Sequence, residues 1–129
     1  MILALAIALG LMATGPEGES LAGYAEPGTY RLEFVDGAPF AAEATIRFEG
    51  SRLIGQGPCN TFSAQIAAPY PWFAIGPIRA TRMACPDLAA EQVLLDSLRE
   101  MELAETVGSV ILLTGQGKSS MEFRRETAP

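Results

Sequence analysis

The sequence predicts a mainly β (α+β) domain, a compact antiparallel β-barrel-like meander of about eight strands with one amphipathic helix. Short alternations of apolar and polar residues, which are typical of half-buried strands, recur between turns rich in Gly, Pro and Asp. One stretch near the middle, residues 86–101, instead spaces its apolar residues as a helix does. The chain has 129 residues, which is enough for one domain and not for two.

The strands before the helix follow from period-two alternation. Residues 29–35 place Tyr30, Leu32 and Phe34 on one face, and Asp36-Gly37 supplies the turn that follows. Each such segment is short, and small or turn-forming residues separate it from the next. The same reasoning predicts five more strands before the helix, over residues 43–49, 52–57, 60–66, 72–75 and 78–84.

The predicted helix begins at Pro86 and runs for about 14–16 residues. Asp87 and Glu91 suit the positive N-terminal end of a helix. Glu91 falls outside the apolar stripe that would pack on a sheet, which consists of Leu88, Leu94, Leu95, Leu98 and Met101. The continuous apolar run 110–113 suggests a strand covered on both faces. Three strands are expected after the helix, over residues 102–107, 110–114 and 119–125.

The N-terminus predicts export. Residues 1–13 are uncharged and almost wholly apolar, too short to span a membrane, and fit the apolar region of a secretory signal. A signal usually begins with Lys or Arg, and none precedes this run. The alternative to a signal is a short apolar helix or strand that packs into the core. Cleavage could follow Ala13, Ala22 or Ala25. We therefore expect a signal peptide and short linker, one domain and a flexible tail, over residues 1–25, 26–125 and 126–129.

Charge and composition limit the classes of partner that can be expected. The net charge of −6 opposes binding to nucleic acid and to anionic lipid, both of which need a basic face. No cysteine follows the apolar run, so a lipoprotein-type anchor is not expected. We expect a periplasmic or secreted protein without a stable membrane span, and a monomer.

The two cysteines, Cys59 and Cys85, favour one structural disulfide, because they form an isolated pair behind an export signal. Closing a loop of about 26 residues would stabilise the fold by roughly 3.5 kcal/mol. Two buried free thiols are the main alternative. A metal site is a poorer one, since the chain has no histidine and two thiolates alone rarely hold a structural zinc.

No catalytic residue, metal ligand or cofactor is expected from the sequence. The lack of histidine excludes Ser–His and Cys–His catalysis. Asn60 is either a binding amide or a structural turn residue that bonds its own backbone. Thr81 either lines a site or is a strand or helix-capping residue. One possible binding patch is aromatic, although Trp72 or Phe73 alone could instead lie in the core; it consists of Tyr70, Trp72 and Phe73.

The residues around the cysteines form a spaced pattern. Asn60 directly follows Cys59, a small residue (Ala64) comes four positions later, and Thr81-x-Met83-Ala-Cys85 follows about twenty residues on. This pattern resembles the META domain, also called the HslJ-like family, of small bacterial envelope proteins. That family usually has glycines where this chain has Pro58 and Ala64. The resemblance covers about residues 28–124.

The resemblance implies a compact antiparallel barrel-like domain with one helix, and structural roles for Asn60, Thr81 and Met83. Members are linked to heat shock, stress response and antibiotic tolerance, and no enzymatic activity is established for the family as a whole. We therefore expect a non-enzymatic protein with an envelope stress or accessory role, whose partner is an unknown envelope protein or small ligand. The alternatives are a carrier of a small hydrophobic ligand and an inhibitor of a secreted hydrolase.

Overall fold

The structure is a computed structural model that describes residues 18–127. The predicted signal segment, residues 1–13, lies outside the described residues. Two helices and nine strands are present in that part of the chain: α2 (Leu21–Tyr24), β1 (Tyr30–Val35), β2 (Ala38–Pro39), β3 (Thr45–Glu49), β4 (Arg52–Gln56), β5 (Thr61–Gln65), β6 (Arg79–Ala80), α3 (Leu88–Glu100), β7 (Met101–Val107), β8 (Val110–Gly115) and β9 (Ser120–Arg125).

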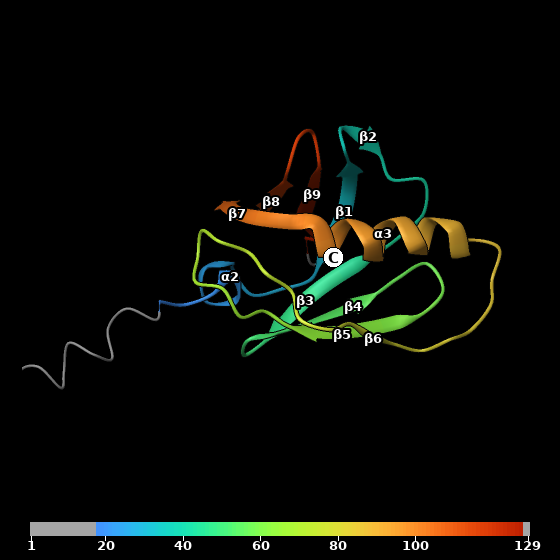
Figure 1. Cartoon of the computed structure of the whole chain (residues 1–129), viewed down its shortest axis with the longest axis horizontal. Coiled ribbons are helices and arrows are strands. Elements are labelled where there is room, and N and C mark those ends of the chain that lie inside the picture. The colour runs from blue at the N-terminus through green and yellow to red at the C-terminus, as the bar shows by residue number, and fades with distance from the viewer. Residues whose placement is uncertain (1–17, 128–129) are drawn as a thin grey trace, which may run out of the picture.

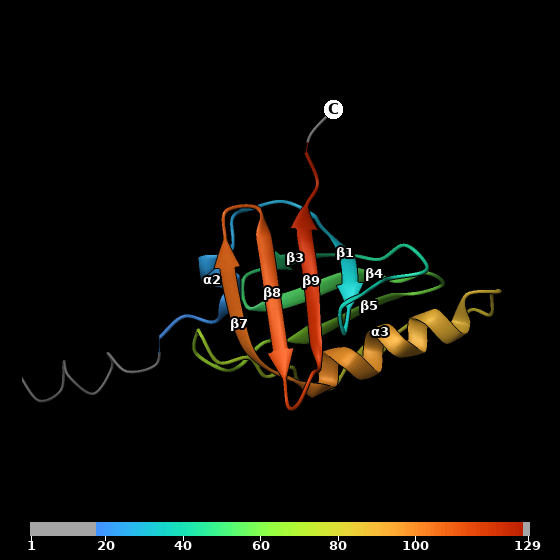
Figure 2. The ribbon, with the colours of Figure 1, turned by 90° about the horizontal axis from the view of Figure 1, so that it is seen from above.

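The strands form one antiparallel sheet that curls into a half-barrel (Figure 1). Its order is β6-β5-β4-β3-β1-β9-β8-β7, and β2 pairs with β1 beside this path. The helix α3 runs directly into β7, as Figure 2 shows from above. The predicted fold class, an antiparallel barrel-like sheet with one amphipathic helix, is therefore confirmed.

The hollow of the half-barrel is filled by one hydrophobic core. The apolar face of α3 contributes Leu94 and Leu98, which are fully buried, and β1 and β9 contribute Tyr30 and Phe123. Burying side chains of this size is the main favourable term in folding. The helix is shorter than predicted at both ends: it begins at Leu88 and not at Pro86, and Met101 already begins β7 and reaches the core as a strand residue.

The alternation predicted for β1 is interrupted by a β-bulge. The register of β1 against β9 shifts between Leu32 and Phe34. A bulge adds one residue to a strand and so exchanges the two faces beyond it. Val35 therefore enters the core, whereas Phe34, which was expected inside, is 37% exposed.

Two of the predicted strands are largely absent. Of residues 72–75, only isolated bridges form, from Trp72 to Leu103 and from Ile75 to Ile66. Of residues 78–84, only Arg79–Ala80 pairs as a strand. Pro71 and Pro77 supply no backbone N–H, which interrupts ladder pairing in this stretch. The run 110–113 was expected to be covered on both faces, but only Ile111 and Leu113 are fully buried, whereas Val110 and Leu112 are half-buried.

Ordered structure extends past both predicted domain limits, residues 26 and 125. At the C-terminal end, the N–H of Glu126 donates to the carbonyl of Thr29 at 2.8 Å; residues 128–129 lie outside the described part. At the N-terminal end, Leu21 in α2 is fully buried in the core. The ring of Tyr24 stacks on Tyr70 with centroids 4.3 Å apart. Cleavage after two of the expected positions, Ala22 or Ala25, would thus remove a core residue, and cleavage after Ala13 would not.

A chain that starts at residue 26 is expected to be less stable than one that starts at residue 18, by about 2–3 kcal/mol, because it lacks the buried Leu21. Urea unfolding of the two chains measures the difference. The point variant Leu21→Ala in the longer chain should reproduce most of the loss. Equal unfolding midpoints for the two chains would show that α2 is not part of the stable domain.

Candidate functional site

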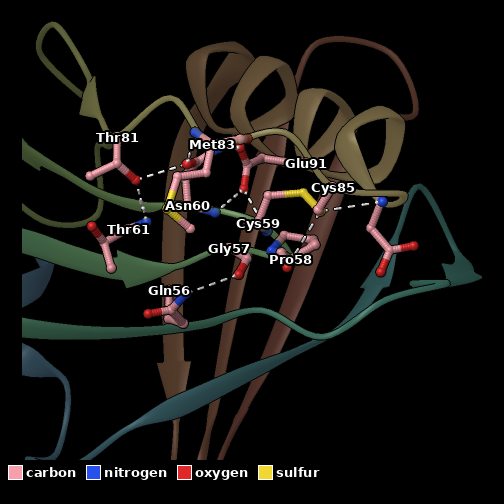
Figure 3. The surroundings of a disulfide bond; sticks show 11 residues. Gln56, Gly57, Pro58, Cys59, Asn60, Thr61, Thr81, Met83, Cys85 and Glu91 are labelled. Atoms are coloured by element: carbon pink, nitrogen blue, oxygen red, sulfur yellow. Dashed lines mark hydrogen bonds between the residues drawn. A yellow bond between two sulfur atoms is a disulfide. The ribbon is translucent and has the colours of Figure 1, made fainter.

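Cys59 and Cys85 form the predicted disulfide (Figure 3). Cys59 lies in the turn between β4 and β5, and Cys85 lies just before α3. Their Cα atoms are 5.8 Å apart, within the usual range for a disulfide. The bond ties the β4–β5 turn to the start of α3, and it excludes both free thiols and a zinc site at these residues.

The side chain of Glu91, on α3, points toward this turn and is buried there. The sequence placed it outside the apolar stripe of the helix, where an exposed side chain was expected. Its side chain is only 5% exposed. The carboxylate accepts three hydrogen bonds: from the backbone N–H of Cys59 at 2.9 Å, from the backbone N–H of Asn60 at 2.7 Å and from Nδ2 of Asn60 at 2.6 Å. Such charge-assisted bonds satisfy the turn's donors at the place where the chain enters β5. One helical carboxylate thus fixes the turn that carries the disulfide.

The side chain of Asn60 connects that turn to the segment before α3. Its Oδ1 accepts from the hydroxyl of Thr81 at 2.8 Å and from the backbone N–H of Met83 at 2.6 Å. Its Nδ2 also donates to the carbonyl of Met83 at 3.2 Å. The amide therefore pairs with Met83 as a strand backbone would, which explains why residues 81–84 do not continue β6. Figure 3 shows these bonds converging on Asn60.

Hydrogen bonds among Asn60, Thr81 and Met83 thus support the structural roles expected for them. The role of Asn60 differs from the turn role inferred from the sequence. Its side chain bonds a distant segment, not its own backbone. Gly57 belongs to the same arrangement, because a Cβ there would lie 2.7 Å from Oε1 of Glu91. We refer to Cys59, Asn60, Thr81, the Met83 backbone and Glu91 as the Asn60 network.

The Asn60 network determines the charge state of Glu91. Burial raises the pKa of Glu91, but the hydrogen bonds from the side chain and backbone of Asn60 and from Cys59 outweigh it and hold the pKa below the ordinary value of 4.5. The ionised form is therefore the one that fits the native structure. All three donors to the carboxylate are provided by the protein itself.

We expect Glu91 to make the protein sensitive to acid. Between the lowered native pKa and 4.5 the unfolded state binds more protons than the native state, so stability falls as pH falls through this window. Above pH 4.5 the contribution is complete. Unfolding free energies of the wild type and Glu91→Gln, measured from pH 7 to pH 3, should converge as pH decreases. A constant difference over that range would contradict the assignment.

An open groove adjoins the Asn60 network and runs between the segment 78–84 and α3. Its volume is about 380 Å³. Asn60 and Glu91 contribute to its lining, and their polar groups are already engaged with each other. The rest of the lining is mostly apolar or basic and includes Ile78, Ala80, Arg82, Met83, Leu88 and Leu95.

The predicted aromatic patch is divided by the structure. Phe73 is 3% exposed and belongs to the core, whereas Trp72 is 59% exposed and Tyr70 is half-buried. The loop is held against the edge of β7, because the N–H of Phe73 donates to Glu102 at 2.8 Å and the N–H of Ala104 donates to Pro71 at 2.7 Å. Tyr70 adds a bond from the N–H of Thr106 to its hydroxyl oxygen at 3.0 Å.

Trp72 therefore extends the outward face of β7, on which the apolar Leu103 and Val107 flank the exposed Glu105. Its isolated bridge places it next to Leu103, which is 42% exposed, and Val107 on the same strand is 66% exposed. A shallow hollow of about 390 Å³ beside them includes Tyr70, Pro71 and Leu112 in its lining. We call the exposed apolar residues here the tryptophan surface: Trp72, Leu103, Val107 and the half-buried Leu112.

Among residues 18–127, no group of three or more His, Cys, Asp and Glu side chains could hold a metal ion. Across the same residues, no helix is long and apolar enough to cross a membrane.

The family of the chain follows from a match to the META domain model over residues 23–128. The chain belongs to the META-domain family. This confirms the resemblance seen in the sequence, and the Asn60 network contains four of the residues that carried it, Cys59, Asn60, Thr81 and Met83. No curated protein matches the META-domain chain in sequence.

Solved structures of similar fold accompany this match. An NMR structure of a protein from Burkholderia xenovorans has a TM-score of 0.64 at 19% identity, covering 83% of this META-domain chain and 87% of that one. A crystal structure of a DUF4847 family protein from Bacteroides vulgatus has a TM-score of 0.64 at 12% identity, covering 84% and 99%. At these identities the similarity shows a shared fold and nothing about function.

Proposed function

We propose that this META-domain protein is a non-enzymatic, exported protein of the bacterial envelope that binds another protein through the tryptophan surface. The proposal includes the envelope stress or accessory role expected from the family resemblance. The observation that carries the binding proposal is the exposure of Trp72 on a loop that five hydrogen bonds and one ring stack hold in place.

All but one of those contacts come from two segments beside the loop, β7 and residues 19–24. Besides the bonds to β7, the N–H of Tyr70 donates to Glu19 at 2.7 Å and the N–H of Trp72 donates to Pro69 at 2.8 Å. The ring of Tyr24 stacks on the ring of Tyr70. An aromatic anchor on a preorganised loop loses little conformational entropy when it binds, which is the property of interface hot spots.

Two features support the export and non-enzymatic parts of the proposal. The disulfide between Cys59 and Cys85 suits an oxidising compartment such as the periplasm. Neither histidine nor a free thiol is available for catalysis, because the chain has no histidine and both cysteines are in the disulfide, and the buried carboxylate of Glu91 accepts three hydrogen bonds from the protein.

The two alternative functions fit less well. A carrier of a hydrophobic ligand would need space inside the half-barrel, where Tyr30, Phe123 and Leu94 are fully buried in contact with the core. An inhibitor that inserts a loop into an enzyme cleft would need a protruding loop. Trp72 instead lies along β7 through its bridge to Leu103, which favours docking of a flat surface.

Affinity capture from an envelope fraction tests the proposal. The wild-type protein should retain a partner that Trp72→Ala retains at least tenfold less, because truncation of an aromatic hot spot costs about 2 kcal/mol or more of binding energy. The matched control is Val93→Ala, which shortens an apolar side chain of α3 that is 47% exposed. Capture of the same proteins in equal amounts by the wild type and Trp72→Ala would refute the role of Trp72.

A further inference from the structure

The two edge strands of the sheet, β7 and β6, differ in whether another segment covers their outer backbone groups. The edge of β7 is covered, because the segment 71–73 bonds to Glu102 and Ala104. The other terminal strand is β6, which pairs with β5 and with no other strand in the described part of the chain. The N–H of Thr81 donates to the carbonyl of Thr61 at 3.1 Å, and backbone groups of adjacent residues in an antiparallel strand alternate in direction. The N–H and C=O of Ala80 therefore point away from β5, toward an open edge.

The groove beside α3 adjoins this open edge. Ile78, Ala80 and Arg82 line it from the strand side, and Leu88 and Leu95 line it from the helix. Met83 reaches the same place with a side chain that is 64% exposed, and a flexible thioether can adapt to several apolar shapes. The groove thus offers unpaired backbone groups next to an apolar trough, which is the arrangement used to bind an extended peptide as an added strand.

The charges at this edge indicate which peptide fits. Of the nine basic residues in the chain, five lie in ion pairs, including Arg99 with Asp96 at 3.1 Å. Arg79 and Arg82 are among the four that form no ion pair within residues 18–127, in a protein whose net charge is −6. Arg82 lines the groove, and Arg79 lies on the opposite face of the edge beside Arg52. Successive side chains of an added strand would point alternately to these two faces.

We propose that the groove binds an extended peptide segment of another protein by strand addition to the β6 edge. The peptide alternates apolar side chains, which enter the trough between Ile78 and Leu88, with acidic side chains, which face Arg79. A carboxylate at the groove end pairs with Arg82. The Asn60 network keeps the edge and the helix at a fixed separation, so the site is formed before the peptide arrives. This site is separate from the tryptophan surface, and either can fail without the other.

Selection from a displayed library of random nine-residue peptides on the purified disulfide-bonded protein tests this. The expected result is enrichment of peptides that alternate apolar and acidic residues. Two variants should weaken the binding of a selected peptide at least tenfold in calorimetric titrations: Arg82→Glu, which reverses the charge, and Ala80→Pro, which removes the outward N–H without touching the pairing with β5. The matched control Lys118→Glu reverses another unpaired charge far along the chain and should leave affinity unchanged.

A second measurement applies if Ala80→Pro does not fold. Methylating single backbone nitrogens of the selected peptide should abolish binding at alternate positions only, because only every second N–H of an added strand faces the edge. The proposal is overturned if no acidic–apolar sequence is enriched, or if Arg82→Glu and backbone methylation leave the affinity within twofold of the starting value.

Discussion

Replacing Glu91 with alanine is expected to lower the free energy of unfolding by about 3–5 kcal/mol. The substitution leaves the N–H groups of Cys59 and Asn60 and the side-chain amide of Asn60 without their acceptor, in a place that is almost fully buried. Equilibrium unfolding in guanidinium chloride measures the loss. Glu100→Ala is the matched control, since it removes an exposed glutamate from the same helix and should cost less than about 0.5 kcal/mol.

The variant Glu91→Gln separates the charge from the shape. Its amide oxygen can still accept from both backbone N–H groups, but its NH₂ faces Nδ2 of Asn60, a second donor. Asn60 cannot reverse its amide to help, because Oδ1 already accepts from Thr81 and Met83. We expect a loss of about 1–3 kcal/mol. A loss below 1 kcal/mol for Glu91→Ala itself would mean that the Asn60 network does not hold the turn.

Removing the disulfide is the second large effect. The double variant Cys59→Ala, Cys85→Ala should lose about 3.5 kcal/mol, because the bond closes a loop of 26 residues in the unfolded chain. Reductant should destabilise the wild type by a similar amount and leave the double variant unchanged. Unfolding curves with and without reductant supply the comparison.

Thiol titration gives an independent check on the same bond. Purified wild-type protein denatured without reductant should contain no reactive thiol, since both cysteines are paired. Two titratable thiols there, together with unfolding curves that do not respond to reductant, would contradict the disulfide.

Much of the fold was predictable because its signals are local. Alternation identified most of the strands, helical spacing identified α3, and the pair of cysteines identified the disulfide. The errors arose where a distant contact overrides the local pattern. The bulge in β1 depends on pairing with β9, and it reversed the expected positions of Phe34 and Val35. The segment after β6 left the sheet because the Asn60 side chain replaced a strand partner for Met83.

The candidate site was less predictable, for the same reason. Glu91 has the position and charge of an ordinary residue in the first turns of a helix, so the sequence alone places it in solvent. Its burial depends on three donors some 31 positions earlier in the chain. Leu21 was assigned to a linker because four residues of helix give little periodicity. The aromatic residues are a different case, because the sequence left open which of Trp72 and Phe73 lies in the core, and the structure buries Phe73 and exposes Trp72. Binding at this patch stays a prediction.

The most direct test of the proposed function is site-specific photo-crosslinking in the envelope. A photoreactive phenylalanine derivative at position 72 would sample the partner that contacts the tryptophan surface, and the same derivative at position 93 would sample the exposed side of α3. The proposal predicts one dominant protein adduct from position 72 and none of that adduct from position 93. No adduct at position 72, or the same adducts from both positions, would contradict binding through Trp72.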